Sequence, residues 1–87
     1  SPGIPVKMNR KYPDKNQALI GFGKKFKKGK NYFNLSKKGS LKEAANNLYK
    51  TMRMIKKMNF KSIGVTKIPY NEIGLAINDR LNKASKK

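Results

Sequence analysis

One apolar stripe in the middle of the chain has the period of an α-helix. Its members recur at steps of three and four residues: Leu41, Ala44, Ala45, Leu48, Met52 and Ile55. Residues at this spacing share one face of a helix, so the pattern predicts an amphipathic helix packed on a core. Basic residues lie off the stripe at Lys42, Lys50, Arg53 and Lys57.

Both ends of this helix have signals in the sequence. Ser40 and Glu43 form a capping box, in which the Ser40 hydroxyl accepts from the Glu43 amide and the Glu43 carboxylate accepts from the Ser40 amide. The helix is therefore expected to begin at Ser40 and to end near Asn59. Tyr49, Met54 and Met58 flank the stripe, and we expect them to widen its buried side.

Three short apolar runs predict strands at residues 18–22, 32–36 and 62–66. The connection between the first two is too short for a crossover helix. We therefore expect either an antiparallel pair or two parallel strands with another strand between them. A second helix is predicted over residues 71–84, with Asn71 as N-cap, Glu72 in the first turn and an inner stripe at Ile73, Ile77, Leu81 and Ala84.

The order strand, strand, helix, strand, helix is typical of an α/β fold. It predicts a small three-stranded Rossmann-like layer with two packed helices, in which residues 32–66 form a right-handed crossover. Residues 1–17 contain Pro2, Pro5 and Pro13 and have no helical period. They are interpreted as an extended N-terminal linker arm without an element of its own, and residues 18–87 as the folded domain.

The charge of the chain is strongly one-sided. Twenty-two Lys and Arg stand against four acids, which gives this basic protein a net charge of +18 over 87 residues. Such a charge attracts polyanions such as RNA. The Lys-rich composition of an A+T-rich genome explains the charge equally well.

Composition also limits the chemistry. The chain has no Cys and no His, which excludes disulfides, zinc sites and histidine acid–base catalysis, and four scattered carboxylates disfavour a metal cage. We expect this chain alone not to be an enzyme and to hold no cofactor. No apolar stretch reaches the roughly 20 residues of a membrane helix. A soluble, cytoplasmic domain without a membrane partner is expected, and the alternative of a membrane-surface helix is disfavoured because the stripe is needed as core.

A basic loop between the first two predicted strands is the best nucleic-acid candidate. It carries Phe26 among five lysines, Lys24, Lys25, Lys27, Lys28 and Lys30. Ammonium groups would meet phosphates and the ring would stack on an unpaired base. The alternative is a solvated loop whose neighbouring rings belong to the core. Gly21 and Gly23 do not make a dinucleotide fingerprint, because Phe26 occupies the place of the third glycine.

Several segments resemble the carboxy-terminal domain of two-domain threonylcarbamoyl-AMP synthases. They are residues 34–36, the helix with residues 43–49, the strand before Ile68 and Pro69, and above all residues 72–84. The resemblance covers residues 18–85. The arm, with Ser1, Pro2 and Gly3 and then Tyr12 and Pro13, is similar to the interdomain linker of that family.

The resemblance implies a non-catalytic accessory domain in tRNA threonylcarbamoyladenosine modification. The catalytic domain would lie upstream as a partner and would use ATP and a divalent metal, while the linker arm covers its active site. Asp79 and Arg80 match the motif and are interpreted as architectural residues, with Arg80 and Asp79 each needing a separate partner. Two departures are that the arm has no His and that the distance from Gly3 to Tyr12 is longer than in the family.

Two functions of different class therefore remain open. The first is the accessory domain that docks on a synthase. The second is a free-standing RNA-binding module that contacts tRNA phosphates through residues 24–30 and the basic side of the helix.

Overall fold

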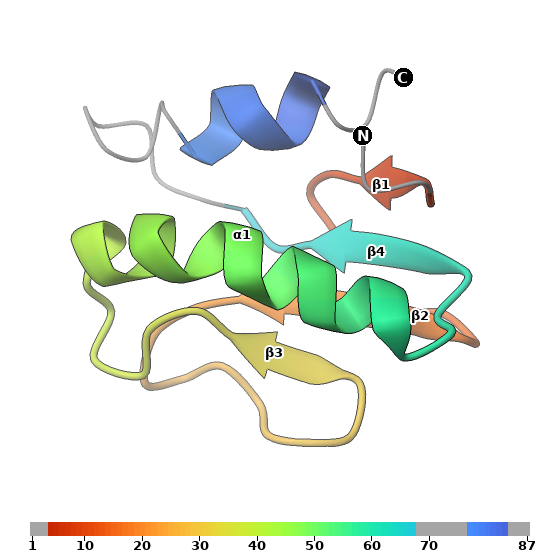
Figure 1. The fold of residues 1–87 in the computed structure, drawn as a ribbon. Helices are drawn as coiled ribbons and strands as arrows, with labels where there is room; N and C mark the ends of the chain where they lie inside the picture. The colour runs from red at the N-terminus through yellow and green to blue at the C-terminus, as the bar shows by residue number, and fades with distance from the viewer. Residues whose placement is uncertain (1–3, 68–76, 84–87) are drawn as a thin grey trace.

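The computed structural model describes residues 4–67 and 77–83 of the chain. These residues form a parallel sheet with helices on one face, in an α/β arrangement (Figure 1). The elements are β1 (Val6–Lys7), β2 (Gln17–Gly21), β3 (Tyr32–Asn34), α1 (Leu41–Lys57) and β4 (Ser62–Val65). Residues 77–83 are also helical. The predicted class and the two helices are confirmed, while the rest of the second predicted helix, with Asn71, Glu72, Ile73 and Ala84, lies outside the described residues.

The sheet has four strands in the order β1, β4, β2, β3, which corrects the expectation of three. The extra strand comes from the arm: Val6 pairs with Ile63 and Lys7 with Gly64, both in parallel. The arm is also held where the Arg10 amide donates to the Val65 carbonyl at 2.8 Å. The expectation that residues 1–17 contain no element is therefore wrong, because a strand of two residues is too short to show an alternating pattern.

Strands β2 and β3 are direct parallel neighbours, with Leu19 opposite Tyr32 and Gly21 opposite Asn34. This excludes both arrangements expected for them. The connection over residues 22–31 is long enough to return the chain to the start of the sheet without a helix. It does so with two turns, closed by the bonds from the Phe26 amide to the Gly23 carbonyl and from the Tyr32 amide to the Gly29 carbonyl.

Helix α1 connects β3 to β4 across one face of the sheet. In Figure 1 the parallel strands run to the left, α1 lies in front of them, and the chain rises from β3 to β4. The crossover is right-handed, as predicted from the twist of strands. Met58 caps the helix with its amide bonded to the Ile55 carbonyl, and Asn59 follows in the left-handed conformation with φ of 63°.

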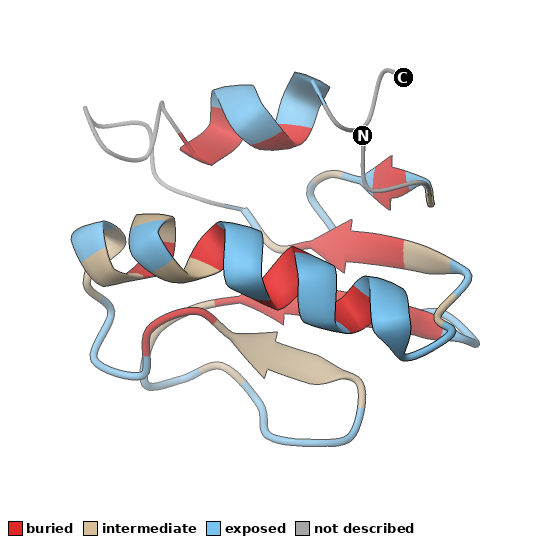
Figure 2. Cartoon of the chain, in the orientation of Figure 1, coloured by how far each residue is buried: buried red, intermediate tan, exposed pale blue. Residues whose placement is uncertain are grey.

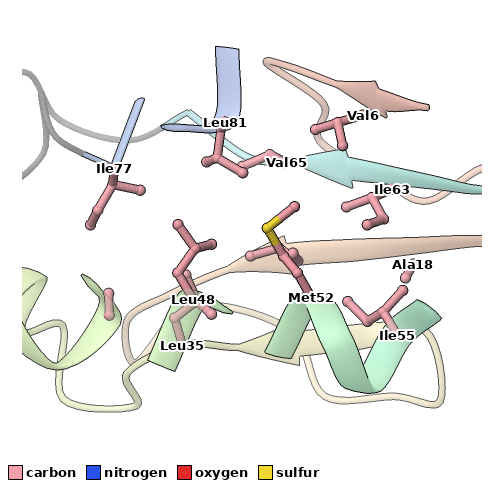
Figure 3. Close-up of a cluster of buried hydrophobic side chains, with 12 residues drawn as sticks. Val6, Ala18, Leu35, Leu48, Met52, Ile55, Ile63, Val65, Ile77 and Leu81 are labelled. Carbon is pink, nitrogen blue, oxygen red and sulfur yellow. The ribbon is translucent and has the colours of Figure 1, made fainter. Parts of the chain in front are cut away.

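The core lies between α1, the segment 77–83 and the facing side of the sheet (Figures 2 and 3). It is made of Val6, Ala18, Ile20, Leu35, Ala44, Leu48, Met52, Ile55, Ile63, Val65, Ile77 and Leu81. The predicted stripe of α1 supplies four of these, and Ile77 and Leu81 confirm part of the second stripe. Tyr49, Met54 and Met58 are exposed, so the expected widening of the buried side is wrong, and Thr51 is buried instead.

In the part of the chain that the structure describes, no helix covers the opposite face of the sheet. Leu19 and Gln17 point to this face, because they alternate with Ala18 and Ile20 of the core, and both are fully buried. The Gln17 side chain accepts from the Asp14 amide at 2.9 Å and donates to the Ser62 hydroxyl at 3.0 Å. Among the described residues, no buried side-chain polar atom lacks a hydrogen-bond partner.

Candidate functional site

The five lysines of the predicted loop are all exposed, on the connection between β2 and β3. This connection curls below β3 at the foot of Figure 1. The residues that follow each strand, Gly23 and Ser36, are joined by a bond of 2.7 Å from the Gly23 amide to the Ser36 carbonyl. The loop therefore begins at the carboxyl edge of the sheet, where ligands of open α/β sheets commonly bind.

A cavity of about 510 Å³ lies between this loop and β3. It is lined by Gly23, Lys24, Phe26, Lys27, Lys28, Gly29, Tyr32, Asn34 and Lys37. Three of the five predicted lysines thus line the cavity, whereas Lys25 and Lys30 do not. Lys37 was not predicted, because it lies in the connection from β3 to α1 and only the parallel pairing of β2 and β3 brings it to the loop.

The ring of Phe26 is packed on the sheet. A β-carbon at Gly21 would overlap this ring, so glycine is required for Phe26 to lie against the strand. Phe26 also makes an edge contact with Tyr32, with ring centroids 5.7 Å apart and planes at 66°. Phe26 is half-buried and lines the cavity, so it forms part of a fixed wall.

Ser36 is buried and organises the backbone beside the cavity. Its hydroxyl accepts from the Ser40 amide at 2.9 Å and donates to the Glu43 carboxylate. The Ser40 hydroxyl accepts from the Glu43 amide at 3.2 Å, as predicted. The other predicted bond of the capping box, from the Ser40 amide to the Glu43 carboxylate, is replaced. The Ser40 amide donates to the Ser36 hydroxyl instead, and that hydroxyl donates to the Glu43 carboxylate.

Asn34 connects the two segments that line the cavity. Its side-chain amide donates to the Gly23 carbonyl at 3.0 Å, and its side-chain oxygen accepts from the Ser36 amide at 3.0 Å. Both polar ends of this side chain are therefore engaged, and they fix the start of the loop relative to the end of β3.

The arm reaches the same region through Tyr12. The Lys27 ammonium lies 5.8 Å from the centroid of the Tyr12 ring, which is 65% exposed. Pro13 is half-buried, while Ser1, Pro2 and Gly3 lie outside the described residues. The structure therefore brings the predicted arm residue Tyr12 to the basic loop, a relation that the sequence alone does not indicate.

The other predicted motif residues lie away from the loop. Asp79 pairs with Lys83 at 3.1 Å within the same helical segment, and both side chains are exposed. Arg80 is exposed on that segment, and Glu72 lies outside the described residues. The ion pair of Asp79 thus stays within its own helix, where pairs of this spacing stabilise the helix itself.

Neither a metal-binding cluster nor a membrane-spanning helix is present among the described residues. Residues 4–67 and 77–83 contain no group of three or more His, Cys, Asp or Glu side chains arranged to hold a metal ion. None of the helices in these ranges is both long and apolar enough to cross a membrane.

Comparison with protein families gives a match over nearly the whole chain. Residues 5–86 match the family described as the C-terminal domain of threonylcarbamoyl-AMP synthase. The match begins before β1, so it includes most of the arm as well as the sheet and both helices. Neither the comparison with curated proteins nor the comparison with solved structures gave a match.

Proposed function

Because this chain belongs to the family of threonylcarbamoyl-AMP synthase C-terminal domains, which act within multidomain synthases of tRNA modification, we propose that it is the accessory, non-catalytic domain of such an enzyme. Its partner is the catalytic domain, which binds ATP and a divalent metal and carries out the chemistry. The absence of Cys and His from the sequence supports this division of labour. A role in tRNA modification also supports the expected cytoplasmic location.

The attachment of the arm to the body carries the proposal. Val6 is 4% exposed in the core, the Arg10 amide is bonded to β4, and Tyr12 contacts Lys27. An arm held at these three points moves with the body. We therefore propose that the body sets the position of Tyr12 and Pro13, and that these residues help to cover the active site of the catalytic domain when the domains are docked.

Docking is tested by calorimetric titration of the 87-residue chain into a threonylcarbamoyl-AMP synthase catalytic domain. The proposal predicts binding that weakens about tenfold in Tyr12→Ala, because a large exposed aromatic side chain is typical of interface anchors. Tyr49→Ala is the matched control, since Tyr49 is 59% exposed but lies on α1. Equal effects of the two substitutions would exclude the arm from the docking surface.

The second candidate function is contact with tRNA phosphates through the basic loop. It is favoured by one observation: Lys24, Lys27 and Lys28 converge with Lys37 on one cavity. The basic residues of α1 are exposed as well, so the charge is available to a polyanion. Binding to the phosphate backbone would be insensitive to sequence and steeply dependent on salt.

This candidate is tested by the salt dependence of tRNA affinity. Changing the five loop lysines to Gln should flatten the plot of log affinity against log salt by about 2–4, since each phosphate contact contributes roughly 0.7–0.9 to the slope. The control changes five other exposed lysines: Lys7, Lys11, Lys15, Lys61 and Lys67. A slope that falls equally in both variants would mean that the whole surface attracts tRNA without a loop site.

A further inference from the structure

The cavity below β3 combines two kinds of lining residue. Four of its nine residues, Lys24, Lys27, Lys28 and Lys37, carry an ammonium group, and the nine include no acid. The Glu43 carboxylate accepts from the Ser36 hydroxyl and is not among the lining residues. An anion in the cavity therefore meets positive charge from two separate segments, and no carboxylate lines the cavity.

The remaining wall is apolar and fixed before any ligand arrives. Tyr32 lies on the face of β3 opposite the core, because it alternates with Phe33, which packs against the core. Its ring lies close to Gly29, where a β-carbon would come 2.9 Å from it, and its edge contact with Phe26 holds both rings. Rings held in this way need little ordering when a flat group binds against them.

The backbone around the cavity is also preorganised. Asn34 bonds both Gly23 and Ser36, and the Gly23 amide donates to the Ser36 carbonyl. The segments that carry Lys24 and Lys37 are thereby tied together at their bases. Their side chains stay exposed, so they can close around an anion at the mouth of the cavity.

We propose that this cavity binds one phosphorylated nucleotide unit, with its phosphate among Lys24, Lys27, Lys28 and Lys37. Its flat base stacks on one of the two rings of the wall, Phe26 or Tyr32, whose planes stand at 66° to each other. The volume of about 510 Å³ is in the range of pockets for ligands of this size. Ammonium groups and aromatic faces are the two groups with which proteins hold a nucleotide without reading its sequence. The unit comes either from a single-stranded segment of RNA or from a free nucleotide.

The structure allows binding in the cavity to be distinguished from general attraction of anions to the charged surface. Lys25 and Lys30 are exposed on the same loop but do not line the cavity. The double variants Lys24→Gln/Lys37→Gln and Lys25→Gln/Lys30→Gln therefore lose the same charge, and only the first loses it from the cavity. All four side chains are exposed, so both variants are expected to unfold at the same urea concentration as the unchanged chain.

The experiment measures binding of four probes to the 87-residue chain: inorganic phosphate, uridine, uridine 5′-monophosphate and an unstructured oligouridylate. Binding is followed by NMR at the Gly23 and Gly29 amides. Uridine 5′-monophosphate is expected to bind more tightly than phosphate or uridine alone. The double variant Lys24→Gln/Lys37→Gln is expected to bind it about tenfold more weakly. The control, Lys25→Gln/Lys30→Gln, is expected to lose less than about threefold, because exposed charges outside the cavity are screened.

The source of the nucleotide follows from the same data. Tighter binding of the oligouridylate than of the mononucleotide supports RNA, and binding of the mononucleotide alone supports a free nucleotide. The inference deepens the second candidate function and rests on it only for the RNA source. Equal weakening in the two double variants would overturn nucleotide binding in the cavity. It would leave intact the proposal that the charged surface contacts tRNA. Binding of phosphate as tight as the mononucleotide would overturn the role of the rings.

Discussion

Val6 of the arm lies opposite Ile63 of β4 as a parallel strand partner, with both side chains in the core. This relation makes Val6 and Lys7 part of the folded body. Replacing Val6 by Ala is expected to lower the free energy of unfolding by about 1–2 kcal/mol, through the lost burial of two methyl groups and the space that they leave. Urea denaturation measures the effect.

Lys7→Ala is the matched control, because its side chain in the same strand is exposed. It is expected to change stability by less than about 0.5 kcal/mol. A Val6→Ala variant as stable as this control would show that the arm is not packed in solution.

The contact between Gly21 and Phe26 predicts a pair of coupled substitutions. Gly21→Ala is expected to cost about 1–3 kcal/mol of stability, because the new methyl group would overlap the Phe26 ring. In a Phe26→Ala background the same substitution should cost clearly less, since the obstructing ring is gone. The four proteins are compared by urea denaturation, and additive costs would contradict the packing of Phe26 on Gly21.

The hydrogen bonds of Ser36 at the start of α1 predict that its replacement lowers the stability of the fold. Ser36→Ala removes the acceptor of the Ser40 amide and the donor to Glu43, in a buried position, and should lower the free energy of unfolding by about 1–3 kcal/mol. Glu43→Gln keeps an oxygen that can accept from Ser36 and is expected to cost less. Thermal unfolding of both variants measures the two costs. A larger loss of stability in Glu43→Gln than in Ser36→Ala would contradict the central role of Ser36 in this network.

The buried side of α1 predicts a contrast between two methionines. Met52 is 8% exposed in the core and Met54 is 47% exposed. Met52→Ala should cost about 2–5 kcal/mol, and Met54→Ala less than about 0.5 kcal/mol. Chemical denaturation of the two variants gives both values, and similar costs would mean that the helix faces the sheet with a different side.

The sequence is most informative where a signal repeats along several turns. The cap at Ser40 places the start of α1 correctly, and the stripe through Leu48 and Ile55 gives its buried side. The helix ends at Lys57, two residues before the end expected near Asn59. The prediction is wrong at the edges of the stripe. Tyr49 and Met54 are expected to be buried, but they lie at helix positions that face solvent. Apolar character alone does not decide burial at the edge of a stripe.

Sheet topology depends on contacts that leave little local trace. The strand at Val6 is two residues long, and its pairing with Ile63 joins residues more than fifty positions apart. The same holds for the candidate site. The loop lysines form a visible cluster in the sequence, but only the parallel pairing of β2 and β3 brings Lys37 to that cluster. Which lysines line the cavity, Lys24 but not Lys25, is known only from the structure.

We propose that this chain assists a synthase domain and has no catalytic activity of its own. It is tested most directly by measuring threonylcarbamoyl-AMP formation from threonine, bicarbonate and ATP by a catalytic domain with and without the 87-residue chain, and by the chain alone. An accessory role predicts no product from the chain alone and a changed rate or substrate affinity when the two are combined. Product from the chain alone, or a catalytic domain unaffected by saturating chain, would contradict it.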